Sequence, residues 1–315
     1  MSVKIVFTDY YYPDIEDERA ILAELGDVEI VDCTKIIPGG AKTEEQLLPY
    51  VKDADALIVQ FADISAKVIG QMERCKVIAR YAIGVDIIDI EAATKKGIRV
   101  ANVPDYCINE VADTAMGHLL NAMRKITVAR DMTLAGKFSM DAIRPVKRME
   151  ESTLGLLGFG HIARNLAGKA RSFFKRIIAF DPYFEGQAEY PDIEFLAMED
   201  ILEQSDAISI HVPLTPATKD MISTKEFAMM KDGVVLVNTA RGGVIDESAL
   251  LDALASGKVG HCGLDVISSE NFAHSPLLAH PKVTLTPHIG WCSEEGAAEL
   301  QRKTAANVVS ALRAG

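Results

Sequence analysis

The chain has 315 residues, of which 49% are hydrophobic and 25% are charged. This length is sufficient for two domains, each with its own hydrophobic core. The formal net charge of −12 disfavours nucleic acid or an anionic membrane as the main partner, because binding to phosphate groups requires clustered Lys and Arg.

The first hundred residues alternate between strand-like and helix-like segments. Apolar strand patterns are expected over residues 4–9, 28–33, 56–60, 77–81 and 99–103, and helical patterns over 16–25, 44–51, 65–71 and 88–96. Such alternation is typical of a doubly wound α/β domain with a parallel sheet. This part of the chain contains no glycine-rich nucleotide fingerprint of its own.

A long helical pattern over residues 109–135 is expected to bridge this domain to a second α/β domain. The strands of the second domain are expected over 153–157, 177–180, 207–211, 234–238, 260–265 and 283–286, and a last helix over 294–312. We expect this last helix to pack against the first domain. The prediction is therefore one domain of residues 1–101 and 287–315, and another of residues 102–286.

The first residues lead directly into a strand, without the charged leader and apolar core of a secretory signal. No segment approaches the roughly 18 apolar residues of a membrane span, so we expect a cytoplasmic protein. The five cysteines include no C-x-x-C pair and are expected to be reduced. The histidines show no ligand spacing such as H-x-x-x-H, and no metal is expected.

The most specific motif is an apolar strand that runs directly into glycines over residues 154–163. Gly158 suits a tight turn, Gly160 lets a diphosphate approach the backbone, and Ala163 replaces the third glycine of the dinucleotide fingerprint. The helix that follows would direct its N-terminal amides and positive dipole end toward that anion. The motif predicts a nicotinamide cofactor, and the alternative is an ordinary glycine turn.

An acidic residue follows the next predicted strand. Asp181 lies roughly 20 residues after the glycines, where a carboxylate binds the adenosine ribose. The carboxylate favours NAD over NADP because it repels a 2′-phosphate, and the following Pro182 and Tyr183 provide no arginine to bind one. The alternative interpretation is a solvated surface aspartate.

Three further motifs place polar side chains after apolar strands, where ligands of open α/β sheets bind. Arg241 precedes two glycines and suits the bidentate binding of a carboxylate. Asp265 and Glu270 follow the next strand, and His288 follows Pro287 after the last one. Each motif alone could be structural, since such arginines often bind backbone carbonyls and such histidines often pack or lie at the surface.

In this order, the motifs resemble those of the D-2-hydroxyacid dehydrogenase family over essentially the full chain. The resemblance rests on the segments 158–163, 181–183, 211–215, 238–243, 264–266 and 287–288. It implies a Rossmann domain that binds NAD and a discontinuous, flavodoxin-like domain that binds the substrate. It also implies an oxidoreductase that interconverts a small D-2-hydroxy acid and its 2-keto acid by hydride transfer.

The resemblance assigns the catalytic roles to Arg241, Glu270 and His288. His288 would be the acid or base at the substrate oxygen, Glu270 would orient its imidazole and favour its charged form, and Arg241 would bind the substrate carboxylate or carbonyl. The implied substrate site also includes Ile83, Gly84, Val85 and Trp291, with Gly84 and Val85 as amide donors. The implied cofactor site consists of Gly158, Phe159, Gly160, His161, Ile162, Asp181, His211, Val212, Pro213, Thr239, Ala240, Asp265 and His288.

The segment 112–114 with His118, and Trp291 after the last motif, resemble the branch that contains the C-terminal binding proteins and their bacterial dehydrogenase relatives. That branch offers an alternative function, an NAD(H)-sensing protein that assembles with protein partners. The chain ends soon after its last predicted helix, without a long partner-binding tail, and this favours the enzyme. The family also implies a homodimer.

Two positions depart from the commoner family pattern. Cys107 stands where many relatives carry Asn, and Asn271 stands where Pro is usual. Both bear on loop shape more than on chemistry. The sequence does not identify the hydroxy acid, because such selectivity depends on a pocket formed by several loops.

Overall fold

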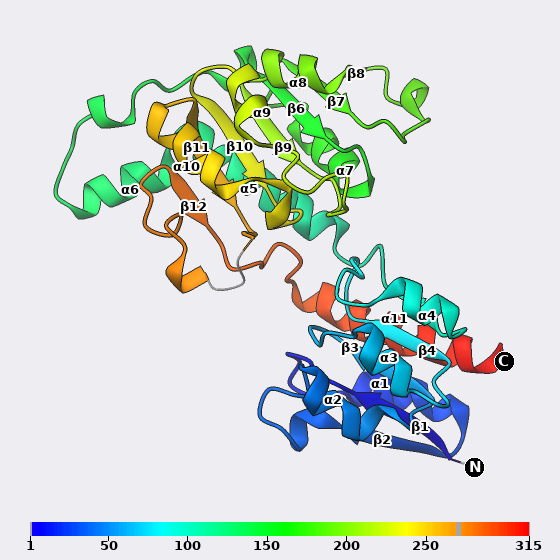
Figure 1. Ribbon diagram of the computed structural model, residues 1–315. Coiled ribbons are helices and arrows are strands. Elements are labelled where there is room, and N and C mark those ends of the chain that lie inside the picture. The colour runs from blue at the N-terminus through cyan, green and yellow to red at the C-terminus, as the bar shows by residue number, and fades with distance from the viewer. Residues whose placement is uncertain (1, 269–271, 315) are drawn as a thin grey trace. The chain divides into compact units, whose positions relative to one another are not determined.

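The computed structural model describes residues 2–268 and 272–314 (Figure 1). Its contacts divide the chain into two compact units, Met1–Tyr106 with Ser293–Gly315, and Cys107–Cys292. The divisions expected from the sequence, after residues 101 and 286, lie a few residues earlier. The segment 287–292 stays with the second unit because its backbone hydrogen-bonds to Asp265.

The first unit contains a five-stranded parallel sheet in the order β2-β1-β3-β4-β5. Its strands are β1 (Val3–Phe7), β2 (Val28–Asp32), β3 (Ala56–Val59), β4 (Val77–Arg80) and β5 (Arg99–Ala101). This is the flavodoxin-like strand order, in which the direction of winding reverses between β1 and β3. The predicted fold class of this region is confirmed.

Helices cover both faces of this sheet. They are α1 (Glu16–Leu22), α2 (Glu44–Val51), α3 (Ala66–Gln71), α4 (Ile90–Lys95) and α11 (Glu294–Arg313), with short 3-10 turns at Ala23–Leu25 and Cys33–Lys35. Leu57 and Ile78 pack on one face against Leu47 of α2 and Val68 of α3. On the other face α11 packs against α1 and β4, so the last helix belongs to the first unit.

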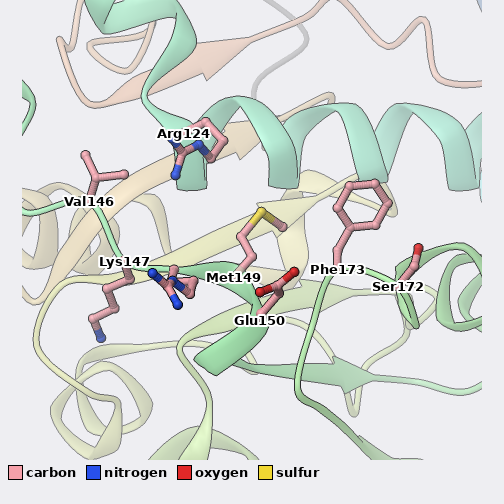
Figure 2. A pocket seen from close by; sticks show the side chains of 8 residues that line it. Arg124, Val146, Lys147, Met149, Glu150, Ser172 and Phe173 are labelled. Carbon is pink, nitrogen blue, oxygen red and sulfur yellow. The ribbon is translucent and has the colours of Figure 1, made fainter.

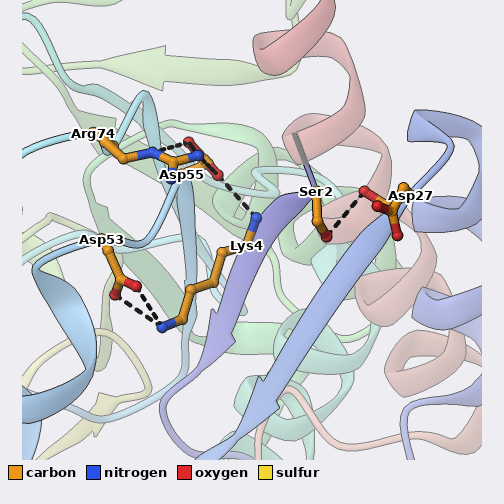
Figure 3. Close-up of polar contacts among 6 residues, drawn as sticks. All are labelled: Ser2, Lys4, Asp27, Asp53, Asp55 and Arg74. Carbon is orange, nitrogen blue, oxygen red and sulfur yellow. Dashed lines mark hydrogen bonds and ion pairs between the residues drawn. The ribbon is translucent and has the colours of Figure 1, made fainter.

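An aspartate joins the amino ends of the neighbouring strands β1 and β3 (Figure 3). Asp55 accepts the backbone amide of Lys4 at 2.8 Å, and Arg74 donates to the same carboxylate at 2.8 and 2.9 Å. The Lys4 ammonium extends to Asp53 at 2.8 Å. These contacts fix the register of β1 against β3.

The second unit contains a seven-stranded parallel sheet in the order β12-β11-β10-β9-β6-β7-β8. Its strands are β6 (Thr153–Leu157), β7 (Arg176–Phe180), β8 (Ile193–Phe195), β9 (Ala207–Ile210), β10 (Val234–Asn238), β11 (Val259–Leu264) and β12 (Val283–Leu285). Counted from β6, the order is 3-2-1-4-5-6 with one added strand, which is the Rossmann order. The winding reverses between β6 and β9.

The helices of this unit are α5 (Ile108–Arg124), α6 (Ile126–Leu134), α7 (His161–Ala170), α8 (Met198–Gln204), α9 (Thr224–Met229) and α10 (Glu247–Ser256). Short 3-10 turns lie at Asp141–Ile143, Met149–Glu151, Gln187–Glu189, Gly242–Val244 and Phe272–His274. One core packs α5 and α7 on Leu154 and Leu156 of β6. The other core packs α8, α9 and α10 on Leu157 and Ile208. Within the described ranges, no helix combines the length and apolarity that crossing a membrane would require.

Two sequence expectations for this unit are corrected. The helix predicted over 109–135 is broken at Lys125, which adopts a left-handed conformation with φ 57° between α5 and α6. The side chain of Asn121 accepts the amide of Thr127 at 2.9 Å and so stabilises the new helix start. The edge strand β8 is absent from the prediction because the charged Glu194 interrupts its three residues, which therefore give no continuous apolar run.

Candidate functional site

The glycine turn follows β6 at the point where the winding of the sheet reverses. Gly158 has φ +90°, and a Cβ there would lie 2.8 Å from the carbonyl oxygen of His211 at the end of β9. No other residue type fits without strain. Gly160 occupies the N-cap position of α7, and no side-chain cap hydrogen bond is made there. A Cβ on Gly160 would meet nothing within 4 Å. The N-terminus of α7 is therefore open.

Asp181 follows β7 and holds the glycine turn. Its carboxylate accepts the backbone amide of Phe159 at 2.8 Å and that of Tyr183 at 2.9 Å. The Phe159 ring points into the core, where it packs edge-on against Phe195 with the ring centroids 4.9 Å apart. His161, the first residue of α7, is exposed. Asp181 is half-buried and retains an accessible side.

The end of β9 faces the glycine turn. His211 Nε2 lies 2.9 Å from the hydroxyl of Ser209. Burial lowers the pKa of His211 to about 4, so the imidazole is neutral near pH 7. The next residues are Val212, whose side chain would contact a Cβ on Gly158, and the exposed Pro213.

The end of β10 positions Arg241. Asn238, the last residue of the strand, is fully buried and donates to the Arg241 carbonyl at 2.9 Å while it accepts the amide of Ala240 at 2.9 Å. These bonds fix the backbone from which the Arg241 side chain leaves the sheet. The hydroxyl of Thr239 is buried and has no hydrogen-bond partner among the described residues.

The ends of β11 and β12 are joined by Asp265, which is 1% exposed. Its carboxylate accepts the hydroxyl of Thr286 at 2.6 Å and the amides of Ile289 and Gly290 at 3.0 and 2.8 Å. The amide of His288 donates to the backbone carbonyl of Asp265 at 2.8 Å. His288 itself has φ +54°, a left-handed conformation that costs free energy in a non-glycine residue, and its side chain is exposed.

The remaining predicted residues fall into three groups. Glu270 lies outside the described residues. Trp291 is half-buried in the second unit. Ile83 and Gly84 lie in the first unit, after β4, where Asn102 donates to the Ile83 carbonyl at 2.5 Å and Arg80 donates to the Gly84 carbonyl at 2.6 Å. The amides of residues 83–85 find no acceptor in the part of the chain that the structure describes.

The second unit therefore brings five strand ends together. β12, β11, β10, β9 and β6 are neighbours in one parallel sheet, so the residues that follow them share its carboxyl edge. The glycine turn, Arg241 and His288 are all on this edge.

The glycine turn fits a dinucleotide on three structural observations. The amides at the start of α7 are uncapped, the space beside Gly160 is open, and the Thr239 hydroxyl is buried without a partner among the described residues. Helix N-termini of this kind bind phosphate through amides and the helix dipole. Asp181 lies beside this turn and accepts the amide of Phe159.

A cavity of about 520 Å³ lies elsewhere in the second unit (Figure 2). Arg124, Lys147, Met149 and Phe173 are among its lining residues. Lys147 and Met149 precede β6, Phe173 precedes β7, and Arg124 is the last residue of α5. The cavity therefore lies at the amino edge of the sheet. None of the predicted site residues lines it.

Two residues of the site are not predicted from the sequence. Asn238 fixes the Arg241 backbone, and Thr286 bonds Asp265. A polar residue at the end of an otherwise apolar strand is a signal that could have identified Asn238. No local signal identifies Thr286, because its partner is distant in sequence.

Comparisons with known proteins agree with this geometry. Residues 116–290 match the family model of the NAD binding domain of D-isomer specific 2-hydroxyacid dehydrogenases. The chain is 38% identical over 273 residues to the hydroxypyruvate reductase of Thermotoga maritima, with 85% of this chain and 87% of that protein covered.

Two further relatives extend the comparison. The chain is 39% identical over 296 residues to the D-3-phosphoglycerate dehydrogenase of Methanocaldococcus jannaschii; the match covers 93% of this chain and 54% of that protein, so the chain spans about half of that relative's length. The crystal structure of a glyoxylate reductase from Paecilomyes thermophila superimposes with a TM-score of 0.87 at 30% identity, covering 99% of this chain and 95% of that one.

Proposed function

Because the chain belongs to the D-isomer specific 2-hydroxyacid dehydrogenase family, we propose that it is an NAD-dependent oxidoreductase that interconverts a small D-2-hydroxy acid and its 2-keto acid. The observation that carries the proposal is that an open, uncapped glycine turn shares one sheet edge with Arg241 and His288. We therefore propose that one unit carries both the binding site for a dinucleotide and the side chains for proton transfer and anion binding.

The residues of this edge suit the reaction. When bound, the cofactor supplies or accepts the hydride. In reduction, the His288 imidazolium donates its proton to the carbonyl oxygen of the keto acid, and in oxidation the neutral imidazole takes the hydroxyl proton. Arg241 binds the substrate carboxylate or carbonyl and stabilises charge on the oxygen. Glu270 is proposed to orient His288.

The substrate carboxylate is proposed to bind the amides of residues 83–85 in the first unit. The carbonyls of Ile83 and Gly84 are held by Asn102 and Arg80, whereas the amides have no acceptor among the described residues. A loop with its carbonyls fixed and its amides available is suited to an anion. Trp291 is proposed to shape the side of the site that receives the substrate side chain.

The choice of hydroxy acid is tested with purified protein and a panel of 2-keto acids. Relatives of this chain are named hydroxypyruvate reductase, glyoxylate reductase and D-3-phosphoglycerate dehydrogenase, so the panel contains hydroxypyruvate, glyoxylate, phosphohydroxypyruvate and pyruvate. We expect turnover of at least one member with NADH, and slower turnover with NADPH because the Asp181 carboxylate repels a 2′-phosphate. Absence of turnover across a wide panel, with NADH bound, would contradict the enzymatic assignment.

A homodimer is proposed as the assembly. Helix α6 contains no buried residue, and large apolar side chains on it and after it are exposed, among them Leu134 at 71% and Phe138 at 88%. Exposed apolar patches on soluble proteins commonly mark protein interfaces. Light scattering on the wild type and on Phe138→Ser is expected to show a dimer that the substitution weakens. A monomeric wild type would contradict this assembly.

The branch of the family and the location in the cell are also proposals. Residues 112–114 with His118 and Trp291 support placement near the C-terminal binding proteins. The alternative function of that branch, NAD(H)-dependent assembly with protein partners, is less favoured because relatives are named dehydrogenases and reductases. We propose a cytoplasmic enzyme.

A further inference from the structure

A row of buried polar groups connects helix α5 to the carboxylate behind the His288 turn. His118 of α5 is 5% exposed, and its Nε2 lies 3.1 Å from the hydroxyl oxygen of Thr286 at the end of β12. That hydroxyl donates to Asp265 Oδ1 at 2.6 Å. The His118 ring is thus two hydrogen bonds away from the group that holds the turn.

The protons of this row can be assigned from what each group is able to donate. The Asp265 carboxylate accepts hydrogen bonds, so the single hydroxyl proton of Thr286 is used in the 2.6 Å bond. The oxygen of Thr286 then has only lone pairs to offer His118. Burial lowers the pKa of His118, which keeps the ring neutral near pH 7. Nε2 must therefore carry the ring proton, and Nδ1 must be bare.

The packing around the ring is tight enough to fix its position. A Cβ on Gly263 of β11 would lie 2.7 Å from the His118 Cβ and 2.9 Å from Nδ1. Glycine at this position is what allows the imidazole to lie against the sheet. The His118 ring is therefore held by β11 on one side and by the hydrogen bond from Nε2 to Thr286 on the other.

Asp265 is the point where the row meets the proposed active site. Asp265 Oδ1, which accepts the hydrogen bond from the Thr286 hydroxyl, also accepts one from the amide of Ile289, and Oδ2 accepts one from the amide of Gly290. These amides follow His288, whose left-handed backbone is strained. A carboxylate that is rotated away from these amides would release the turn from which the His288 imidazole projects.

We propose that His118 and Thr286 are positioning residues for His288, acting through Asp265. The Nε2 proton of His118 and the hydroxyl proton of Thr286 hold the carboxylate in the rotation that fixes the 288–290 turn. This inference rests on the proposed function of His288 as the acid or base, and it adds two residues that act on His288 through Asp265.

The structure provides a matched control on the same helix and strand. Asn121 lies one turn after His118 on α5, and its side-chain amide donates to the hydroxyl of Thr284 on β12 at 2.8 Å. Thr284 also contacts His261 Nε2 at 3.2 Å. This bond joins the same two elements and reaches no carboxylate, so its loss reproduces a general loosening of β12 without affecting Asp265.

The experiment compares Thr286→Val, Thr286→Ser and Thr284→Val in the full-length enzyme. Thr286→Val is expected to lower kcat roughly 10- to 100-fold, as small misplacements of catalytic groups do, with KM for the keto acid within about twofold of wild type. Thr286→Ser retains a hydroxyl and is expected to restore kcat. Thr284→Val is expected to lower Tm by a similar amount to Thr286→Val and to leave kcat unchanged.

A second measurement does not require turnover. Nitrogen-15 NMR of the imidazole rings, with His118 assigned by its loss in His118→Gln, is expected to show the tautomer protonated at Nε2. Protonation at Nδ1, or equal kcat for Thr286→Val and Thr284→Val, would overturn the inference. A wild type that binds NADH and reduces no keto acid would instead contradict the proposed function, and the tautomer would still test the hydrogen-bonded row.

Discussion

The two parallel sheets of this protein are built alike at their amino edges and differently at their carboxyl edges. In the first sheet, Asp55 precedes β3 and accepts the amide of Lys4 in β1 at 2.8 Å. In the second, Asp206 precedes β9 and accepts the amide of Thr153 in β6 at 3.0 Å. In both, an aspartate ties together the two strands between which the winding reverses.

At the carboxyl edge of the first sheet, the crevice between the ends of β1 and β3 is filled by a side chain of the protein. Asp9 follows β1, is fully buried, and its carboxylate accepts the amides of Gln60, Phe61 and Ala62 at 3.2, 2.7 and 3.2 Å. These amides follow β3 and form the kind of cradle in which an anion binds. The carboxylate of the chain itself occupies it.

The second sheet leaves the equivalent place open. The residues after β6 are glycines, the N-terminus of α7 has no side-chain cap, and nothing occupies the space within 4 Å of a Cβ on Gly160. The contrast shows that the fold provides amide-lined crevices at both reversal points, and that side chains decide whether a ligand can enter. The comparison predicts different consequences for substitutions at the two crevices.

Among substitutions at the two crevices, the largest effect is expected from closing the open one. Gly160→Ala is expected to weaken NADH binding roughly 10- to 100-fold, because a methyl group would displace the diphosphate from charge-assisted hydrogen bonds to the amides. The free protein should keep its Tm, since Gly160 has φ −71° and open space around it. Calorimetric titration with NADH measures the first effect.

Gly168→Ala is the matched control for this substitution. Gly168 lies inside the same helix, and a Cβ there also meets nothing within 4 Å. We expect unchanged NADH affinity and a slightly higher Tm, since alanine is favoured over glycine in helices. An unchanged Kd in Gly160→Ala would place the diphosphate away from this turn.

A smaller effect is expected from perturbing the filled crevice. In Asp9→Asn one carboxylate oxygen is replaced by an NH2 group, which cannot accept a hydrogen bond from the backbone amide it faces. The substitution should destabilise the first unit by about 1–3 kcal/mol. Its NADH affinity should equal that of wild type at temperatures where it is folded, because the cofactor site is in the other unit. A stability loss measured by chemical denaturation, with an unchanged NADH titration, would support the distinction between the two crevices; weakened NADH binding in folded protein would contradict it.

The last effect concerns pH and has opposite signs in the two units. Burial lowers the pKa of His261 in β11 to about 4, so the unfolded chain binds a proton below pH ~6.5 that the folded chain does not. Stability contributed by this neutral histidine is lost as the pH falls from about 6.5 to 4, by about 1 kcal/mol per pH unit. In His261→Gln this acid-side loss should be shallower, as measured by denaturation midpoints.

Glu18, a buried acid of the first unit, gives stability the opposite dependence on pH. Burial raises the pKa of Glu18, which accepts hydrogen bonds from Tyr81 and Gln301. Its protonated form is favoured in the folded state, so its contribution is present below the unfolded pKa of about 4.3 and is lost as the pH rises through the folded value. Glu18→Gln should flatten this dependence. A profile unaffected by either substitution would show that other groups control the pH response.

The sequence predicted the sheets well and the contacts between distant residues poorly. Strands buried on both faces produce continuous apolar runs, so most strands were found to within a residue or two. Gly158 was identified because its turn requires a positive φ, which restricts the residue type. The break at Lys125 was not, since a lysine in a left-handed conformation carries no sequence signal.

The same reason limits prediction of the site. Single strand-end residues such as Arg241 are visible because they follow an apolar run. The bond between His118 and Thr286 joins positions 168 residues apart, and the burial of Asp9 under a loop after β3 depends on the sheet order. Neither pairing can be derived before the strands are placed.

The most direct test of the account measures NADH binding and keto acid reduction on the same preparation of His288→Ala. Turnover of the best keto acid should fall roughly 100- to 10,000-fold, the contribution expected of a general acid, while NADH binds with nearly wild-type affinity because the open glycine turn is intact. Turnover equal to that of wild type would contradict the assignment of His288 and, with it, the proposal that this sheet edge carries the chemistry.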